Sequence, residues 1–109
     1  MSETEDFYCE EVLSGNTPVE VLVETETVLA FRHTRPFWPV HVVVIPKVHI
    51  SSLLTIEDNT LLIELLEVVK QVAADIVDKH SAARVLTNLG EYQDSKHLHF
   101  HVISGEQIR

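Results

Sequence analysis

Hydrophobic residues in the first part of the chain follow the spacing of β-strands. Two runs rich in β-branched residues, 19–24 and 27–31, flank the polar pair Thr25–Glu26, a pattern typical of a β-hairpin. The run 41–45 (HVVVI) is almost wholly apolar and stops at Pro46. A strand without polar alternation is expected to be buried on both faces, so we predict that this run lies inside a sheet.

The spacing then changes to that of a helix. Apolar residues recur three and four positions apart over 61–77, which predicts a helix over about 55–79. At its start, Thr55 to Asp58 resembles a capping box, with Thr55 positioned to accept a free backbone N–H. The apolar face is wide enough to cover the sheet and to contact a partner subunit as well.

Three further elements complete the predicted fold. The runs 84–88 and 98–104 are predicted strands, and a short helix over 6–13 is expected to stop at Ser14–Gly15. The order β-β-β-α-β-β predicts an α+β fold, in which an antiparallel sheet of about five strands packs against one long helix. The short N-terminal helix precedes this core.

Size and composition restrict the kind of protein. The 109 residues fit a single domain, 1–109, frayed over residues 1–5. A formal net charge of −9 argues against binding a nucleic acid polymer or an anionic membrane through bulk positive charge, although a local site can still bind a small anion. The single cysteine, Cys9, excludes an internal disulfide framework and fits a reducing, cytoplasmic setting. No apolar run approaches the ~18 residues of a membrane span.

Histidine is the unusual residue, with seven in the chain. Three of them, His97, His99 and His101, alternate with large apolar residues over 97–102. Successive side chains of a strand point to opposite faces, so the three imidazoles are expected to share one face. The apolar residues between them are expected to face the core.

Such a face is compatible with three roles. It can be a solvated surface, a metal site, or a set of imidazoles in which one attacks an electrophile. A closed zinc site wants four ligands, and Cys9 has no paired cysteine. Nucleophilic work on a phosphate also needs hydrogen-bond donors, which Asn88, Gly90 and Gln93 supply in the loop just before the triad.

These residues resemble the two signatures of the histidine triad (HIT) superfamily. The resemblance lies in the segments 31–50 (FRHTRPFWPVHVVVIPKVHI) and 88–105 (NLGEYQDSKHLHFHVISG). The family motif is His-φ-His-φ-His-φ-φ, where φ is apolar, and residues 97–103 match it at every position. Upstream features also fall in the family's order: Pro36, His41, Val44 to Lys47, and His49. The resemblance covers residues 5 to 105.

The resemblance implies a chemistry for each imidazole. The middle histidine, His99, is the expected nucleophile, which attacks an α-phosphate and forms a transient nucleotidyl-histidine that water hydrolyses. His97 and His101 flank it, and His41 supports the site from a neighbouring strand. The implied activity is that of a nucleotidyl hydrolase or transferase acting on small nucleotides, such as a nucleoside phosphoramidate. Family members are typically homodimers, so a second copy is the expected partner.

The sequence departs from the family pattern around the substrate. The phosphoramidase branch usually has an Asp after the Phe of the second strand, where it binds ribose hydroxyls, and this chain has Arg32 and His33 there instead. Asp94 stands where a Ser or Thr usually follows the glutamine, and a carboxylate repels phosphate. The loop from Gly90 to Gln93 is shorter than usual, so a slip of one or two residues would bring Ser95 there, and Lys96 would offset the acid. The expected substrate-binding residues are Asn88, Gly90, Gln93, Ser95, Lys96 and His33.

The departures leave other functions open. A dinucleoside polyphosphate hydrolase is the alternative within the enzyme class, and a nucleotide-binding regulatory module with little turnover is the alternative outside it. A metal-dependent hydrolase that uses the triad as ligands is a third. The covalent step itself requires no cofactor, although Mg²⁺ could accompany a polyphosphate substrate. Phe37 and Trp38 either wall a base-binding pocket or plug the loop against the core.

Overall fold

The computed structural model describes residues 8–109. The fraying expected over residues 1–5, and the first two positions of the predicted N-terminal helix, lie outside the described residues. The first described element is η1 (Tyr8–Leu13), a short segment with π-helical hydrogen bonding. It leads into a turn in which the Gly15 N–H donates to the Val12 carbonyl at 3.2 Å and Gly15 has a φ of 85°. Glycine adopts this conformation without steric cost, which suits it to the turn.

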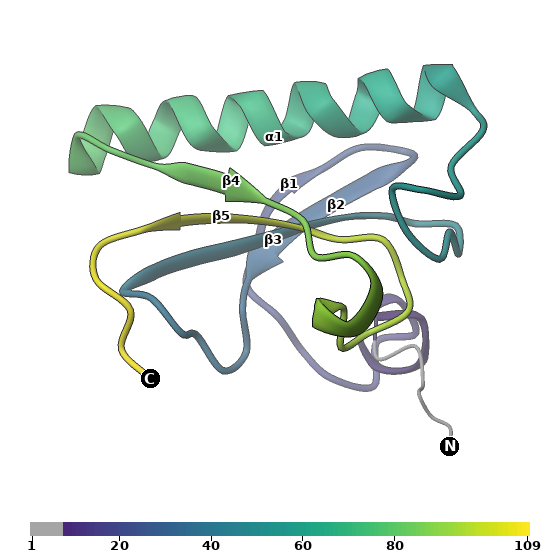
Figure 1. The fold of residues 1–109 in the computed structure, drawn as a ribbon, viewed down its shortest axis with the longest axis horizontal. Helices are drawn as coiled ribbons and strands as arrows, with labels where there is room; N and C mark the ends of the chain where they lie inside the picture. Colours follow the sequence, from purple (N-terminus) through teal and green to yellow (C-terminus); the bar gives the residue numbers. More distant parts are fainter. Residues whose placement is uncertain (1–7) are drawn as a thin grey trace.

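Five strands form one antiparallel sheet in the order β1-β2-β3-β5-β4 (Figure 1). They are β1 (Val21–Glu24), β2 (Val28–Arg32), β3 (Val40–Pro46), β4 (Arg84–Leu86) and β5 (Phe100–Ser104). After the long helix, the chain forms the edge strand β4 and then enters the sheet beside β3 as β5. The α+β class and the five-stranded antiparallel sheet are therefore confirmed.

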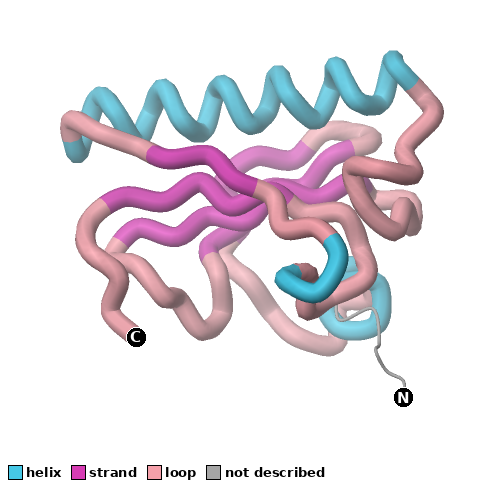
Figure 2. The backbone as a smooth tube through the Cα atoms, viewed as in Figure 1, coloured by secondary structure: helices cyan, strands magenta, loops and turns pink. Residues whose placement is uncertain are grey.

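One long helix, α1 (Asn59–His80), lies across one face of the sheet (Figures 1 and 2). Its N-cap is Asp58, whose Oδ1 accepts the Leu61 N–H at 3.1 Å. The prediction that Thr55 caps the helix is wrong, because the Thr55 hydroxyl accepts the Ser52 N–H at 3.2 Å in the preceding turn. Aspartate is a favourable cap because its charge also interacts with the positive end of the helix dipole.

The central strand β3 contributes to two hydrophobic cores. Val42 and Val44 pack in the core that contains Leu65 and Val69 of α1. Val43 and Ile45 pack in a second core with Tyr8 and Phe31, on the opposite face of the sheet. This arrangement confirms the prediction that the apolar run HVVVI is buried on both sides.

The helix also exposes apolar side chains. Ile63, Leu66 and Val77 are 58%, 46% and 47% exposed. Contact between this surface and a partner subunit stays a prediction. Although α1 is long, no helix within residues 8–109 has the continuous apolar stretch that crossing a bilayer requires.

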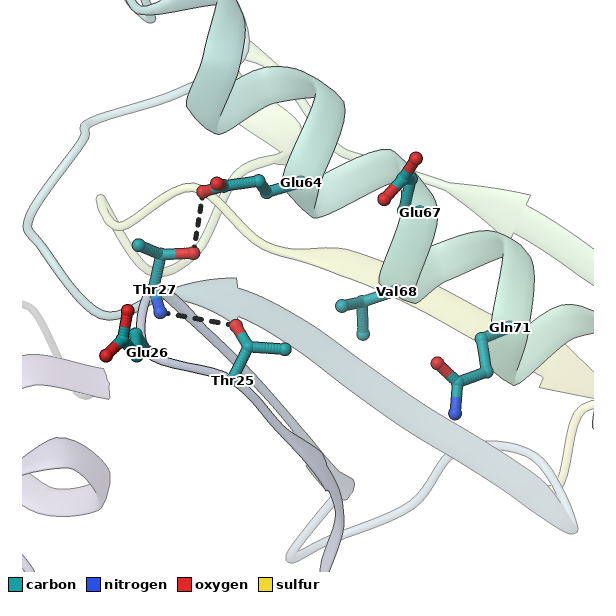
Figure 3. A pocket seen from close by; sticks show the side chains of 7 residues that line it. All are labelled: Thr25, Glu26, Thr27, Glu64, Glu67, Val68 and Gln71. Atoms are coloured by element: carbon teal, nitrogen blue, oxygen red, sulfur yellow. Dashed lines mark hydrogen bonds between the residues drawn. The ribbon is translucent and has the colours of Figure 1, made fainter.

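A groove of about 390 Å³ lies between α1 and the turn that joins β1 to β2 (Figure 3). The Thr27 hydroxyl donates to Oε1 of Glu64 at 2.8 Å and so connects the turn to the helix. Glu26 and Glu67 also line the groove. Its walls are acidic and contain no histidine among the described residues, so the groove is separate from the imidazoles predicted to carry the chemistry.

Candidate active site

The histidine triad lies partly in front of β5 rather than wholly within it. The predicted strand 98–104 begins at Phe100, so only His101 pairs in the sheet, opposite Val43 of β3. The preceding segment is held by the Leu98 N–H, which donates to the Ile50 carbonyl at 2.6 Å. The sequence pattern missed this boundary because a side chain can alternate in direction without its backbone pairing in a ladder.

The alternation of the triad persists across this boundary. Leu98, Phe100 and Val102 all belong to the core beneath α1. The Tyr8 ring, which belongs to the opposite core, lies 6.0 Å from the His97 ring and 4.9 Å from the His99 ring, measured between centroids. The His99 and His101 rings are 4.9 Å apart. The prediction that the imidazoles share one face is confirmed.

His99 is held in one tautomer by the backbone. Its side chain is buried, and its Nδ1 lies 2.7 Å from the His97 carbonyl oxygen. A carbonyl oxygen only accepts hydrogen bonds, so Nδ1 carries the proton. When the ring is neutral, its lone pair is therefore on Nε2, and this is the form that can act as a nucleophile.

His41 and His101 form a hydrogen-bonded pair with a defined direction. The Phe37 N–H donates to Nδ1 of His41 at 3.1 Å, which places the His41 proton on Nε2. That Nε2 donates to Nδ1 of His101 at 2.8 Å. His101 in turn has its proton on Nε2, where it is available to a group bound beside it.

Both members of this pair are neutral at pH 7. Burial, with smaller contributions from the charges of neighbouring imidazoles, lowers the pKa of His101 to about 3. The same causes lower the pKa of His41 to about 4. Desolvation penalises the charged imidazolium, so each ring keeps one donor nitrogen and one acceptor nitrogen.

His33 is a fourth ring of this cluster. It stacks on His41 with centroids 4.3 Å apart and planes at 26°, and its Nδ1 accepts the Arg35 N–H at 2.9 Å. Burial is the main cause that lowers the pKa of His33, followed by the charges of His99 and Arg109. The sequence did not predict the contact between His33 and His41, because a contact between a loop and a strand has no local periodicity.

A cavity of about 320 Å³ opens beside these rings. Phe37 and Trp38 both line it, and the Trp38 ring lies 5.3 Å from that of His41. Among the predicted catalytic and substrate-binding residues, the cavity brings together six: His33, His41, Asn88, Ser95, His99 and His101. Asp94 lines it as well.

Three predicted substrate-binding residues are absent from the described lining of this cavity: Gly90, Gln93 and Lys96. The Gln93 amide donates to the carbonyls of Ser51 at 2.6 Å and Ser95 at 2.9 Å. The Lys96 ammonium donates to the carbonyls of Gly90 and Gln93, at the two ends of the short helix η2 (Gly90–Tyr92). These contacts with backbone carbonyls hold the loop in shape, and the loop carries Asp94 and Ser95 to the cavity wall.

Ser95 has an unused hydrogen-bonding group at this wall. Among the described residues, its buried Oγ has no hydrogen-bond partner in the protein. A buried hydroxyl without a partner is costly, so a ligand that bonds to it would recover that cost. The sequence left open whether Asp94 or Ser95 stands at the phosphate position, and the structure brings both to the cavity.

His97 occupies a different position from the other two triad members. Its ring is fully buried and does not line the described cavity, and Nε2 lies 2.8 Å from the Pro46 carbonyl oxygen at the end of β3. The His97 backbone carbonyl, in turn, orients His99. Its side chain therefore fixes the segment that carries His99.

Replacing His97 should lower the stability of the fold, because its ring hydrogen-bonds to the Pro46 carbonyl and does not line the described cavity. His97→Leu leaves the buried Pro46 carbonyl unpaired, and we expect the free energy of unfolding to fall by about 1–3 kcal/mol in urea denaturation. His97→Gln, whose amide nitrogen approximates the position of Nε2, is the matched control and should retain much of that stability. Equal losses in the two variants would contradict the role of the hydrogen bond.

Cys9 and His49 are the two residues for which the sequence left zinc binding open. The side chain of Cys9 lies outside the described residues, and the His49 ring lies 5.4 Å from that of His97. Within the described part of the chain, no three His, Cys, Asp or Glu side chains converge in a way that would hold a metal ion.

Comparison with known proteins identifies the family. The family model of the HIT domain matches residues 14–108. The chain belongs to the HIT family. An uncharacterized HIT-like protein of Synechocystis sp. is 36% identical over 104 residues, which cover 93% of this chain and 91% of that protein. A HIT-like protein of Helicobacter pylori is 31% identical over 100 residues, with 90% and 95% covered.

Solved structures of HIT proteins have the same fold. A HIT family hydrolase from Legionella pneumophila superposes with a TM-score of 0.80 at 29% identity, covering 96% of each chain. A HIT family hydrolase from Clostridium thermocellum gives a TM-score of 0.80 at 28% identity, covering 99% of this chain and 96% of that one. The HIT motif at residues 97–103 therefore lies in a chain that shares the family's fold over nearly its whole length.

Proposed function

We propose that this HIT protein is a nucleotidyl hydrolase or transferase that acts on the α-phosphate of small nucleotides through a covalent intermediate on His99. The observation that carries the proposal is the hydrogen bond from Nδ1 of His99 to the His97 carbonyl, beside a cavity that His99 lines. It directs the lone pair of a neutral imidazole to Nε2. The names of the Legionella and Clostridium relatives as HIT family hydrolases support the same general activity.

In the first step, the lone pair of His99 Nε2 attacks the α-phosphorus and forms a P–N bond. The bond from phosphorus to the leaving group breaks, and its electron pair departs with that group. Nε2–H of His101 can donate a hydrogen bond to the amine or phosphate as it leaves, and the bond from His41 to His101 favours this orientation of the ring. The neutral ring keeps its proton, and a leaving amine takes its proton from solvent water. The hydroxyl of Ser95 and the amide of Asn88 are available as donors to the phosphoryl oxygens.

In the second step, water attacks the α-phosphorus and the P–N bond breaks. The electron pair returns to His99 Nε2, and the attacking water gives its proton to solvent. A nucleoside monophosphate is released and His99 regains its starting state. Dividing one displacement into two steps lowers the barrier of each step, and neither step requires a metal ion.

A binding module with little turnover is the second candidate. Asp94 lines the same cavity, and its carboxylate would oppose a bound phosphate. Such a module would bind a nucleoside monophosphate without releasing product.

We also propose that the partner is a second copy of this chain. The exposed apolar residues Ile63, Leu66 and Val77 on α1 support this proposal, because burial between two copies would remove them from water. A cytoplasmic location and the absence of nucleic acid or membrane partners stay predictions.

Hydrolysis assays in the presence of a chelator test the activity. We expect the wild-type protein to release AMP from adenosine 5′-phosphoramidate, from diadenosine polyphosphates, or from both, since an imidazole nucleophile works without metal. Activity that disappears with chelation and returns with a divalent ion would favour metal-dependent chemistry. Binding of AMP without turnover of any of these substrates would favour the binding module.

A further inference from the structure

Residues 106–109 run along the cavity of His99. Gln107 lines the cavity, and the Ile108 N–H donates to the Phe37 carbonyl at 2.6 Å. The Arg109 guanidinium lies over the ring of Phe37, 4.8 Å from its centroid. The amide of Gln107 donates to the Arg109 carbonyl at 2.8 Å. This segment is therefore held against the loop that forms one wall of the site.

The position of Arg109 matters because binding several phosphates requires cationic side chains at the cavity. None of the described residues that line it is Lys or Arg, and Asp94 adds a carboxylate. His41 and His101 are neutral at pH 7 because burial lowers the pKa of each ring. The charge of Arg109 does reach the cluster, since it contributes to lowering the pKa of His33.

A substrate with a single phosphate and a substrate with several make different demands on such a site. Attack on a phosphoramidate releases an amine, which leaves without negative charge. Attack on a dinucleoside polyphosphate releases a nucleoside polyphosphate, whose terminal oxygen gains the electron pair of the broken P–O bond. A guanidinium beside the cavity stabilises only the second kind of leaving group strongly.

We propose that Arg109 is a specificity-determining residue that binds the anionic leaving group of a dinucleoside polyphosphate. The inference rests on the proposed function and adds to it the class of leaving group. In the reaction, His99 Nε2 forms the P–N bond, the P–O bond breaks with its electron pair on the departing phosphate, and Nε2–H of His101 donates a hydrogen bond to that phosphate. Arg109 pairs with the negative charge that remains on that phosphate, and water then releases the nucleoside monophosphate from His99.

The test compares two substrates with the same adenylyl group, adenosine 5′-phosphoramidate and diadenosine triphosphate. Arg109→Gln should lower kcat/KM for the triphosphate about tenfold more than for the phosphoramidate, as expected for one partly exposed charge-assisted contact. The extra loss should shrink at high salt, and Arg109→Lys, which keeps the charge, should recover much of it. Lys79→Gln, at the end of α1, is the matched control for loss of one surface charge and should change neither substrate.

Several results would overturn the inference. Equal losses on the two substrates would mean that Arg109 only fastens the segment to Phe37, and the proposed function would stand without it. A selective loss in Arg35→Gln instead would assign the contact to Arg35, which lines a neighbouring cavity of about 230 Å³. Wild-type protein inactive on both substrates would refute the proposed function. Calorimetric titration would then test Arg109 without turnover. A tenfold weaker affinity of Arg109→Gln for diadenosine triphosphate, with the affinity for AMP little changed, would support the contact. An unchanged affinity for diadenosine triphosphate would refute it.

Discussion

His99→Ala should lower kcat for nucleotide hydrolysis by about 10⁴-fold or more, because removing a covalent nucleophile removes the whole stepwise route. The ring is buried and its Nδ1 is already committed to the His97 carbonyl, so Nε2 is the ring nitrogen that remains for attack. His101 is 4.9 Å away between ring centroids, and its Nδ1 accepts from His41, which leaves a proton rather than a lone pair on Nε2. It therefore cannot replace His99 as the nucleophile.

The measurement is a single-turnover experiment on the better substrate, followed by intact-protein mass analysis after quenching in base, since the P–N bond of phosphohistidine is labile in acid. Wild-type protein should gain the mass of one nucleotidyl group and His99→Ala should gain none. His80→Ala removes an exposed imidazole at the end of α1 and serves as the matched control. Residual turnover within tenfold of wild type in a folded His99→Ala protein would rule out the covalent mechanism.

The sequence predicted well those features that depend on local periodicity. The run HVVVI predicted a strand buried on both faces, and Val42 and Val43 do enter opposite cores. The alternation of His97, His99 and His101 predicted a shared face. The alternation holds even before Phe100, where the backbone does not pair with β3. In both cases the direction of a side chain follows from its position in an extended chain, which neighbouring residues alone determine.

The sequence could not predict contacts that form between distant segments or within an irregular loop. The stacking of His33 on His41 depends on how the loop after β2 folds back towards β3. Gln93 and Lys96 bear the right groups to bind phosphate, yet their donors reach backbone carbonyls of their own surroundings. Whether a polar side chain faces a ligand or the loop's own backbone depends on distances in three dimensions. The residue types in the loop therefore gave candidates, but they did not distinguish substrate-binding residues from residues that stabilise the loop.

The start of α1 shows the same limit on a smaller scale. Thr55 and Asp58 are both good capping residues, and their spacing from the apolar run did not distinguish them. The turn closed by Ser52 and Thr55 uses the threonine hydroxyl before the helix begins. Asp58 is then the first side chain free to accept a helical N–H, from Leu61.

Acid should destabilise the folded protein through the same imidazoles that form the site. The pKa of His101 is lowered to about 3 and that of His41 to about 4, while the unfolded chain has histidines near their ordinary value of about 6.5. Below about pH 6.5 the unfolded state therefore binds more protons than the folded one, and stability falls as the pH falls. The loss ends only below the folded-state values. Between pH 7 and pH 4.5 we expect these two groups together to reduce the free energy of unfolding by up to about 5 kcal/mol.

Urea denaturation at several pH values measures this effect, and His101→Asn isolates it. The Asn amide oxygen approximates Nδ1 and can still accept from His41, so the variant removes one titrating group with little change in shape. The slope of unfolding free energy against pH, between pH 6 and pH 4.5, should be shallower in His101→Asn by up to about 1.4 kcal/mol per pH unit, the value for one proton. His80→Asn, at the exposed end of α1, should leave the wild-type slope in place. An unchanged slope in His101→Asn would mean that the folded protein accepts a proton at this ring, and the directed hydrogen bond from His41 to His101 would then be lost in mild acid.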